Sequence, residues 1–204
     1  MPHQLSDPQD DATGSAPATQ AGTSLAALVA RAERAGKGAP PVERWDPEYC
    51  GDIDMVIHAD GRWSYNGSPI TRPALVRLFA TVLRKDPDGR TYLVTPVEKL
   101  GITVEDAHFQ AVEMNREVRD GVPLLTFRTD VGDICAAGPD NPMRFNIGEN
   151  GEFRPYVTVR GRLEARLTRA LAFDLADHVE TEGTRRFVRS GGAEFDIPAT
   201  CGGS

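Results

Sequence analysis

The spacing of hydrophobic residues predicts an amphipathic helix near the N-terminus, within the stretch SLAALVARAERAG. Ser24 can cap this helix and Gly36 can end it. Its apolar stripe needs a partner surface and consists of Leu25, Leu28, Val29 and Ala32. The connector that follows, GKGAPPVERWDPEYCG, is rich in proline and glycine, so we expect a folded domain to begin at about residue 45.

The pattern over residues 55–104 predicts a hairpin, a helix and a second hairpin. MVIHA and RWSYN have strand character, and Asp60-Gly61 between them is a typical hairpin turn. Thr71 is the expected N-cap of a helix that continues to about Lys85, where DPDG ends it. TYLVTP and VEKLGITV then predict two further strands.

A similar pattern returns about ninety residues later and predicts an internal duplication. Ile57, Asp60-Gly61 and Trp63 align at a constant offset with Ile147, Asn150-Gly151 and Phe153. A second helix is predicted over residues 163–179 because leucines recur there with i, i+4 spacing. RRFVRS and AEFDI follow as short strands. Chance is the alternative explanation, since hairpin turns and amphipathic helices are common.

Residues 105–136 predict an antiparallel β-meander with a turn at Asp120-Gly121, and MRFNI continues it into the second copy. The expected fold class is therefore α+β, with two domains that repeat a hairpin-helix-hairpin unit. The second domain should be a bent antiparallel sheet closed by a C-terminal helix. The expected boundaries are a disordered tail at 1–22, a helix and connector at 23–44, domains at 45–104 and 105–198, and a tail at 199–204.

Charge and cysteine content limit the partners and the compartment. The chain has 204 residues and a net charge of −7, which argues against general attraction to nucleic acid or to anionic membranes. Cys50, Cys135 and Cys201 are too isolated to suggest a disulfide framework or a metal site. The N-terminus does not resemble a signal peptide, and no apolar run approaches the ~18 residues that span a bilayer. We therefore expect a cytoplasmic protein without membrane contact.

Three stretches together resemble a bacterial family, domain of unknown function 1285 (DUF1285). They are CGDIDMVIHADGRWSYNGSPITRPALVRLFATVLRKD, YLVTPVEKLGI and MRFNIGENGEFRPYVTVRGRLEARL, and the resemblance covers about residues 45–197. It implies a duplicated two-domain α+β protein whose C-terminal domain is superficially similar to pleckstrin-homology folds. It also implies a binding site for protein or nucleic acid in the interdomain cleft and a role in signalling, with no established activity or cofactor. Shape similarity alone does not imply lipid binding.

Catalytic and metal-binding motifs are weak. Asp52, Asp54, His58 and Asp60 lie close in sequence and could suggest a metal or acid–base site. A turn at Asp60, a loop at Asp52 and Asp54 and a packed or edge histidine explain them better, because no second His/Cys cluster supports a metal. The stretch VEKLGITVEDAHFQAV could form a helix-turn-helix, although its β-branched residues favour strands. We expect no catalytic residue, no metal and no cofactor.

An arginine-rich stretch, RPYVTVRGRLEARLTR, is the strongest candidate for binding. It contains Arg154, Arg160, Arg162, Arg166 and Arg169, the last three with the spacing of one helix face. Such a patch could contact phosphate, carboxylate or an acidic protein surface. The alternative is a solvated face with local ion pairs such as Arg160–Glu164.

Aromatic and polar residues of both copies could also face each other across the domain junction. Aromatic and arginine side chains are typical of binding hot spots, and equally of plain domain interfaces. With the arginines above, the candidate ligand-binding set is Tyr65, Arg72, Thr95, Glu98, Lys99, Phe145, Asn146, Arg154, Tyr156, Arg160, Arg166 and Arg169.

The favoured function is a non-enzymatic binding or regulatory module that holds a protein partner in the interdomain cleft. Nucleic acid in the same cleft is the first alternative. A hydrolase that uses Asp54, His58 or Glu98 is the second. If the arginine patch binds the partner, changing Arg160, Arg166 and Arg169 to glutamate should abolish capture at an unchanged melting temperature. The partner's identity and the oligomeric state stay open.

Overall fold

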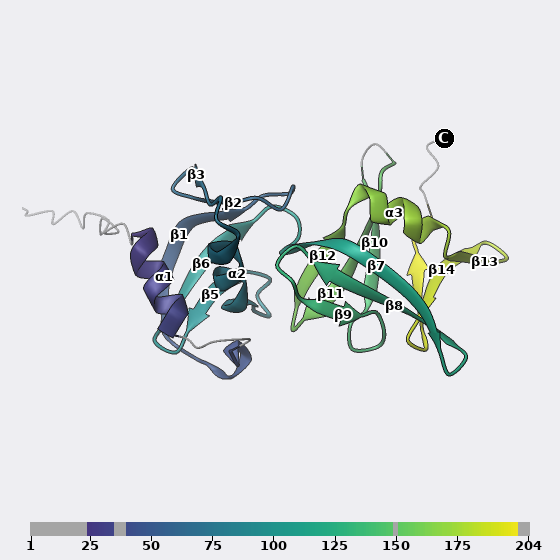
Figure 1. The fold of residues 1–204 in the computed structure, drawn as a ribbon, viewed down its shortest axis with the longest axis horizontal. Coiled ribbons are helices and arrows are strands. Elements are labelled where there is room, and N and C mark those ends of the chain that lie inside the picture. The colour runs from purple at the N-terminus through teal and green to yellow at the C-terminus, as the bar shows by residue number, and fades with distance from the viewer. Residues whose placement is uncertain (1–23, 35–39, 149–150, 200–204) are drawn as a thin grey trace, which may run out of the picture.

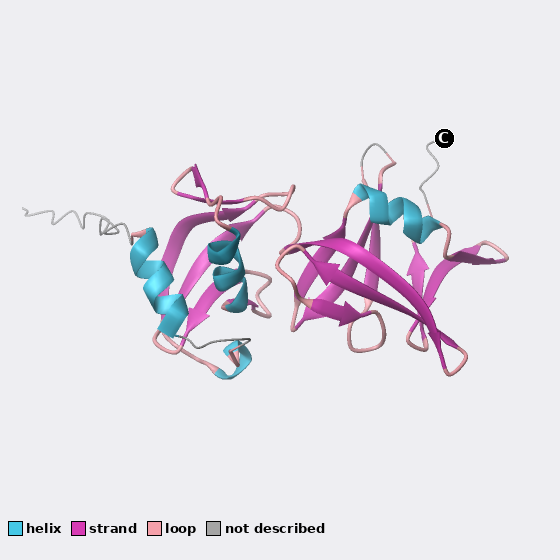
Figure 2. Cartoon of the chain, viewed as in Figure 1, coloured by secondary structure: helices cyan, strands magenta, loops and turns pink. Residues whose placement is uncertain are grey.

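A computed structural model describes residues 24–34, 40–148 and 151–199. The chain forms two sheet-based domains that lie side by side along its longest axis (Figure 1). Strands dominate both domains, and the described residues contain only short helices (Figure 2). Among these residues no helix has the length and apolar character needed to cross a bilayer. The expected tail at 1–22, Gly36, Asn150 and residues 200–204 lie outside the described residues.

The first domain is a mixed six-stranded sheet in the order β3-β2-β1-β6-β5-β4. Its strands are β1 (Tyr49–Ile57), β2 (Trp63–Tyr65), β3 (Ser68–Pro69), β4 (Leu83–Lys85), β5 (Thr91–Thr95) and β6 (Glu98–Val104). β1 and β2 are antiparallel on either side of Asp60-Gly61, as the sequence predicts. β1 also pairs with β6 in parallel, which joins the two hairpins into one sheet.

Two helices pack on this domain, α1 (Leu25–Arg34) and α2 (Pro73–Thr81), together with a short 3-10 turn at Val42–Arg44. The predicted cap of α1 is confirmed, because Ala27 N–H donates to Ser24 Oγ at 3.2 Å. The cap predicted for α2 at Thr71 is wrong by one residue, since Arg72 precedes the helix. The helix also does not reach Lys85.

The chain after Thr81 forms β4 instead of a last helical turn. Leu83 pairs with Leu93 and is fully buried, while Arg84 hydrogen-bonds to the carbonyl oxygens of Val42 and Trp45. Pairing with β5 satisfies the backbone groups that a helical turn would otherwise satisfy, so tertiary contact overrides the helical spacing of the side chains.

The second domain contains another six-stranded sheet, in the order β10-β11-β12-β7-β8-β9. Its strands are β7 (Phe109–Arg119), β8 (Val122–Thr129), β9 (Ile134–Ala136), β10 (Met143–Ile147), β11 (Phe153–Arg160) and β12 (Leu163–Leu167). The predicted β7–β8 turn is confirmed: Asp120 and Gly121 both have positive φ, 52° and 79°, as a two-residue hairpin turn requires. The helix-turn-helix is wrong, because β6 and β7 cover the stretch VEKLGITVEDAHFQAV in place of two helices.

The meander predicted from β7 to β10 is wrong in its last step. β9 and β10 lie at opposite edges of the sheet, and β12 pairs with β7 in parallel. The expected all-antiparallel sheet is therefore mixed. Local sequence predicts that these segments are strands, but their partners depend on contacts between residues about fifty positions apart.

The long second helix is also a wrong prediction. Residues 163–167 form β12, and only Arg169–Ala176 form a helix, α3. Leu163 and Leu167 point inward from the strand, and Leu171 and Leu175 point inward from the helix. A spacing of four satisfies the strand period of two as well as the helical period of 3.6, so this pattern could not distinguish the two elements.

α3 is not the last element of the fold. A separate three-stranded sheet follows, with β13 (Val179–Glu182), β14 (Arg185–Ser190) and β15 (Ala193–Ile197). It is fixed to the larger sheet by Ser190, whose hydroxyl donates to the carbonyl oxygen of Ala137 and accepts from the N–H of Leu125. The buried apolar residues of both domains form one continuous cluster, which runs through the seam between them.

Candidate functional site

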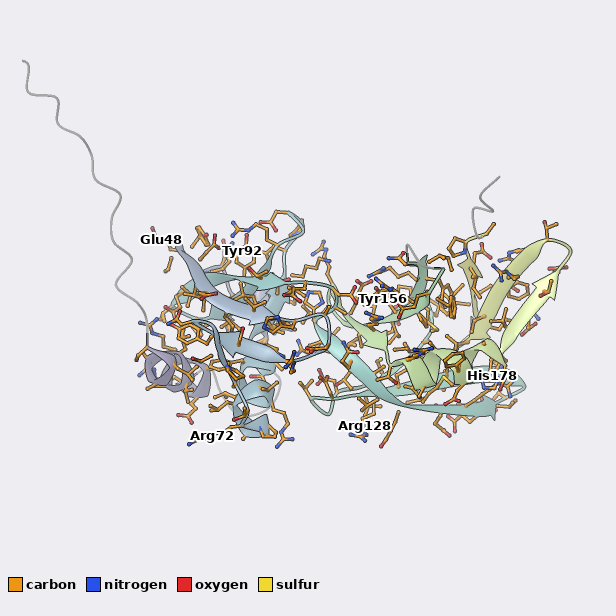
Figure 3. All side chains as sticks on the ribbon, turned by 90° about the horizontal axis from the view of Figure 1, so that it is seen from above. Glu48, Arg72, Tyr92, Arg128, Tyr156 and His178 are labelled. Carbon is orange, nitrogen blue, oxygen red and sulfur yellow. The ribbon has the colours of Figure 1, made fainter. Side chains whose placement is uncertain are left out.

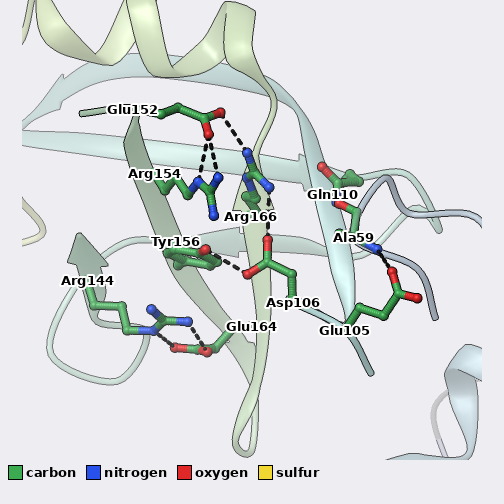
Figure 4. A network of polar contacts seen from close by, with 10 residues as sticks. All are labelled: Ala59, Glu105, Asp106, Gln110, Arg144, Glu152, Arg154, Tyr156, Glu164 and Arg166. Carbon is green, nitrogen blue, oxygen red and sulfur yellow. Dashed lines mark hydrogen bonds and ion pairs between the residues drawn. The ribbon is translucent and has the colours of Figure 1, made fainter. Parts of the chain in front are cut away.

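Residues 105–108 link the two domains and are held by both of them. Glu105 binds back to the β1–β2 turn, where its carboxylate accepts from Ala59 N–H at 2.9 Å and also contacts His58. Asp106 binds forward to β11 and β12 (Figure 4). The linker is therefore a fixed part of the seam rather than a loose connection.

Asp106 anchors the second domain through two partners, the buried Tyr156 and the charged Arg166. Its Oδ1 accepts from the Tyr156 hydroxyl at 2.7 Å, and its Oδ2 accepts from Arg166 Nη1 at 3.0 Å. Burial and the hydrogen bond to Asp106 raise the pKa of Tyr156 to about 12. Arg144 stacks over the Tyr156 ring at 3.8 Å and pairs with Glu164 through two nitrogens. The contacts in Figure 4 form a polar network beside the seam.

His108 connects the domains through both ring nitrogens. Nδ1 accepts the backbone N–H of Glu164 at 3.1 Å, so it carries no proton, and Nε2 lies 3.1 Å from Thr91 Oγ1. The imidazole is therefore neutral, with its proton on Nε2. Burial, together with the nearby positive charge of Lys85, lowers the pKa of His108 to about 4.

This histidine gives the fold a specific pH dependence. Between pH 6.5 and about 4 the unfolded chain binds a proton at His108 that the folded chain does not bind, so stability falls as the pH falls through this window. Once the pH has fallen through the whole window, the free energy of unfolding is lower by about 3 kcal/mol. In His108→Gln, the unfolding free energy measured by urea denaturation should lose about 2 kcal/mol less between pH 7 and pH 4.5. Identical losses in the two proteins would contradict this assignment.

Arg160 and the β1–β2 turn hold the domains together on the other side of the linker. Arg160 Nη2 donates to the carbonyl oxygen of Ala80 in α2 at 2.6 Å, and its guanidinium lies 5.3 Å from the Phe109 ring centroid. Gly61 in the turn lies against Gln110, and a Cβ there would be 2.7 Å from Gln110 Cγ. Only glycine fits this turn without displacing the second domain.

Grooves lie along the seam where the two sheets meet. The Lys85 groove has a volume of about 670 Å3, and its charged lining consists of Lys85, Asp140, Arg144, Arg162 and Glu164. A second groove of about 410 Å3 runs along the linker and also includes Lys85. A third, of about 380 Å3, lies beside the β1–β2 turn and has mainly apolar walls such as Trp63, Ile70 and Val131.

Two cations of the Lys85 groove have no carboxylate partner among the residues that the structure describes. Arg144 is neutralised by Glu164, but no such pair involves Lys85 or Arg162. Lys85 is half-buried, and among the described residues its ammonium has no carboxylate counter-ion. The groove thus contains positive charge that an anion could neutralise.

The arginines of the predicted patch are mostly committed to ion pairs. Arg160 pairs with Asp133, and the pair Arg160–Glu164 is not formed because Glu164 binds Arg144. The predicted shared helix face is wrong, because Arg162 lies in a turn, Arg166 in β12 and Arg169 at the start of α3. The other pairs are Arg154–Glu152, Arg166–Asp106, Arg166–Glu152, Arg185–Glu194, Arg185–Asp196, Arg189–Glu180 and Arg189–Glu194.

The candidate residues of the first copy do not gather at the seam. Glu98 pairs with Arg31 of α1, at the end of the molecule opposite to the second domain (Figure 1). Lys99 lies over the Tyr92 ring in the same region, which Figure 3 shows far from Tyr156. Thr95 and Tyr65 are buried within the first domain, and Arg72 is exposed at the start of α2.

The candidate residues of the second copy do lie together, on β10 and β11. Asn146 pairs with Arg154, Arg144 with Tyr156, and Phe145 stacks on Phe153 with ring centroids 5.5 Å apart. Their polar groups contact each other and Asp106 rather than the first copy. The pairing predicted across the junction is therefore not formed.

The residues of the hydrolase alternative are spread over the first sheet. β1 and β6 are parallel with Tyr49 opposite Lys99 and Ile57 opposite Val104. Glu98 and His58 consequently lie at opposite ends of these strands, about 20 Å apart. His58 binds Glu105 and Ser64, and Asp54 is exposed on β1. Asp52 and Asp60, the other acidic residues near His58 in sequence, bind Arg90 and Arg62. These side chains do not converge on one site.

Sequence reasoning includes Arg162 in the arginine-rich stretch but does not select Lys85, Asp106 or His108 as site residues. Lys85 was assigned to the end of a helix, and Asp106 and His108 to the start of a strand. No motif marks them, because their importance comes from the seam itself. The only available signal was that MVIHADG and ITVEDAH, which lie side by side in the first sheet, both end in polar residues.

Comparisons with known proteins place the chain among others of this architecture. Residues 40–107 match the family model described as domain of unknown function (DUF1285), N-terminal domain, and residues 108–197 match the C-terminal one. A DUF1285 family protein from Silicibacter pomeroyi DSS-3 is 45% identical, with a TM-score of 0.78 over 83% of this chain and 93% of that one. A DUF1285 family protein from Shewanella baltica OS155 is 25% identical, with a TM-score of 0.49 over 61% of this chain and 91% of that one. No curated protein matches the chain.

Proposed function

The chain belongs to the DUF1285 family, and we propose that it is a non-enzymatic binding protein that holds an acidic segment of a protein partner in the Lys85 groove. The observation that carries this proposal is the pair of unneutralised cations, Lys85 and Arg162, in a groove between two domains. Lys85 and Arg162 replace Arg160, Arg166 and Arg169 as the expected partner contacts, because Arg160 and Arg166 already bind protein groups and Arg169 lines a different groove beside α3.

The electrostatics of the seam favour an anionic ligand. A ligand carboxylate could form a charge-assisted hydrogen bond with the ammonium of half-buried Lys85. Lys85 and Arg160 both contribute to the low pKa of buried His108, behind its burial as the main cause. The groove contains three cations against two carboxylates, in a protein whose net charge is −7.

A protein segment fits this groove better than nucleic acid does. A phosphate backbone is bound by extended basic surfaces, whereas this groove offers two free cations flanked by Pro139 and Pro142. The net charge of −7 opposes association with a polyanion at low salt. A short acidic segment needs only a few charge-assisted contacts and apolar wall area.

Charge reversal in the groove should abolish capture of the partner. We expect Lys85→Glu/Arg162→Glu to weaken partner binding at least about tenfold in pull-downs from native lysate followed by calorimetry with the captured protein. The matched control Arg72→Glu/Arg116→Glu makes the same change of charge at two exposed arginines. These arginines line neither the Lys85 groove nor the groove along the linker. Equal binding by the two double variants would contradict the proposal.

Nuclease treatment of the lysate distinguishes the nucleic-acid alternative. Capture that survives nuclease and changes little between low and moderate salt supports a protein partner. Capture lost on nuclease treatment, with affinity that falls steeply as salt rises, would replace it with nucleic acid.

We also infer that the two halves derive from one duplicated unit. Both contain three strands, a helix and three strands: β1–β3, α2 and β4–β6 in one, β10–β12, α3 and β13–β15 in the other. The hydrogen bonds of the β1–β2 turn, His58 N–H to Arg62 O and Gly61 N–H to His58 O, recur 90 residues later from Gly148 and Gly151. The same turn also begins at Asp86 and Thr129, so the element order carries more weight than the turn.

Two further features belong to the proposal. Cys50 and Cys135 are free thiols, which agrees with the reducing cytoplasm. A pleckstrin-homology-like shape and a signalling role, both implied by the family resemblance, stay predictions. The packing of α3 against β7, β11 and β12 is the feature that supports the first.

A further inference from the structure

A groove beside α3 lies apart from the seam and shares no lining residue with the three seam grooves. It has a volume of about 690 Å3 and lies between α3 and the start of β11. α3 lines it with one helical stripe, at positions 169, 172, 173 and 176, while Leu171 and Leu175 on another side of the helix are buried in the core. The helix therefore carries a second, largely apolar stripe that the fold does not bury.

The floor of this α3 groove is apolar. Phe173 is 64% exposed, and Phe153 and Leu167 extend the apolar wall toward the sheet. Ala172 and Ala176 are small, so they leave room above the helix where larger side chains would fill it. A ligand that covered Phe173 would gain hydrophobic free energy roughly in proportion to the area that it buried.

The rim of the α3 groove is cationic. Glu152 accepts from Arg154 Nε at 2.7 Å and from Arg166 Nη2 at 2.9 Å. The hydrogen bond from Arg154 and the charges of Arg166 and Arg169 lower the pKa of Glu152. Arg166 is further neutralised by Asp106, but Arg169 contacts only the Phe173 ring, at 5.7 Å. One carboxylate is thus surrounded by three arginines, and one of these has no carboxylate partner among the described residues.

We propose that the α3 groove binds a small carboxylic acid with an apolar body, such as a medium-chain acyl carboxylate. The ligand carboxylate pairs with Arg169 and shares Arg154, while its apolar body lies along Phe173, Ala172 and Ala176. Glu152 is an internal competitor, because its own carboxylate occupies the guanidinium groups that the ligand needs. The groove volume lies within the range of small-molecule sites, and this site does not depend on the proposed partner site.

Titration of the full chain with decanoate tests the proposal, using calorimetry for affinity and amide NMR shifts for location. We expect binding with shifts concentrated in residues 151–176. Arg169→Gln should weaken binding about threefold or more, and Glu152→Gln should strengthen it by a similar factor. Arg116→Gln removes an exposed cation from β7 that has no carboxylate partner within the described part of the chain, and it should leave affinity unchanged. Phe173→Ala should weaken binding, whereas Ile134→Ala, at a site 70% exposed on β9, should not.

Several results would overturn the α3 site. Decanol binding as tightly as decanoate would show that the arginines contribute nothing. Inorganic phosphate binding as tightly would show that the apolar floor contributes nothing. Undetectable decanoate binding, shifts centred elsewhere, or equal effects of Arg169→Gln and Arg116→Gln would each contradict the assignment.

Discussion

Replacing Asp106 with alanine is expected to lower the free energy of unfolding by about 2 to 3 kcal/mol, because two hydrogen-bond donors, one of them charged, would lose their acceptor at a partly buried site. The Tyr156 side chain is almost completely buried, and its hydroxyl would lose its acceptor. Arg166, largely buried beside it, would lose one of its two carboxylates. Denaturation with urea, followed by fluorescence and circular dichroism, measures the loss.

Asp88→Ala is the matched control, because Asp88 accepts from the Tyr92 hydroxyl at 2.6 Å in the same way. Asp88 is exposed, so water can replace its carboxylate, and the expected loss is much smaller than that of Asp106→Ala. Asp106→Asn keeps one acceptor and should fall between the two alanine variants. Equal losses in Asp106→Ala and Asp88→Ala would contradict the role assigned to the linker.

Replacing Gly61 with alanine is the second large effect, with an expected loss of about 2 to 4 kcal/mol. One part of this loss is local, because φ at Gly61 is +84°, where a Cβ is disfavoured. The other part comes from the seam, where the new Cβ would lie 2.7 Å from Gln110 Cγ in the second domain. Thermal and urea denaturation of the full chain measure the sum.

Gly89→Ala separates the two parts. Gly89 has a φ of +83° in the same kind of turn, and nothing lies within 4 Å of the position of its Cβ. In Gly89→Ala, the free energy of unfolding should fall only by the cost of placing a Cβ at positive φ, about 1 to 2 kcal/mol. Adding Gln110→Ala to Gly61→Ala should recover part of the difference. If Gly61→Ala costs no more than Gly89→Ala, the turn does not press against the second domain.

Local features of this fold could be predicted because short-range chemistry determines them. Ser24 caps α1 with its own hydroxyl, and Asp120-Gly121 forms a two-residue turn since both residues accept positive φ. The family could also be identified from motifs along the sequence. In each case, the decisive interactions join residues that are close in the chain.

Longer-range features could not be predicted from the same patterns. The leucines at 163, 167, 171 and 175 fit a helix, yet pairing of β12 with β7 and β11 makes the first two part of a strand. The sequence patterns also do not predict which groups the arginines pair with. Arg160 binds Asp133 and the carbonyl oxygen of Ala80, neither of which is near it in sequence.

These contacts change the expectation for the triple arginine variant. Glutamate at position 160 would remove the hydrogen bond to Ala80 and face Asp133, so the melting temperature should fall. A loss of capture in that variant would then report a disturbed seam rather than a lost contact. Lys85 and Arg162 avoid this ambiguity, since neither forms an ion pair among the described residues.

Hydrogen–deuterium exchange of the full chain, with and without its captured partner, tests the central claim most directly. Partner bound in the Lys85 groove should slow exchange at β4, at residues 138–144 and at the β11–β12 turn, which together line it. Exchange in α1 and in the β5–β6 turn, at the far end of the first domain, should not change. Slower exchange in α1 and that turn, with no change along the groove, would contradict the account.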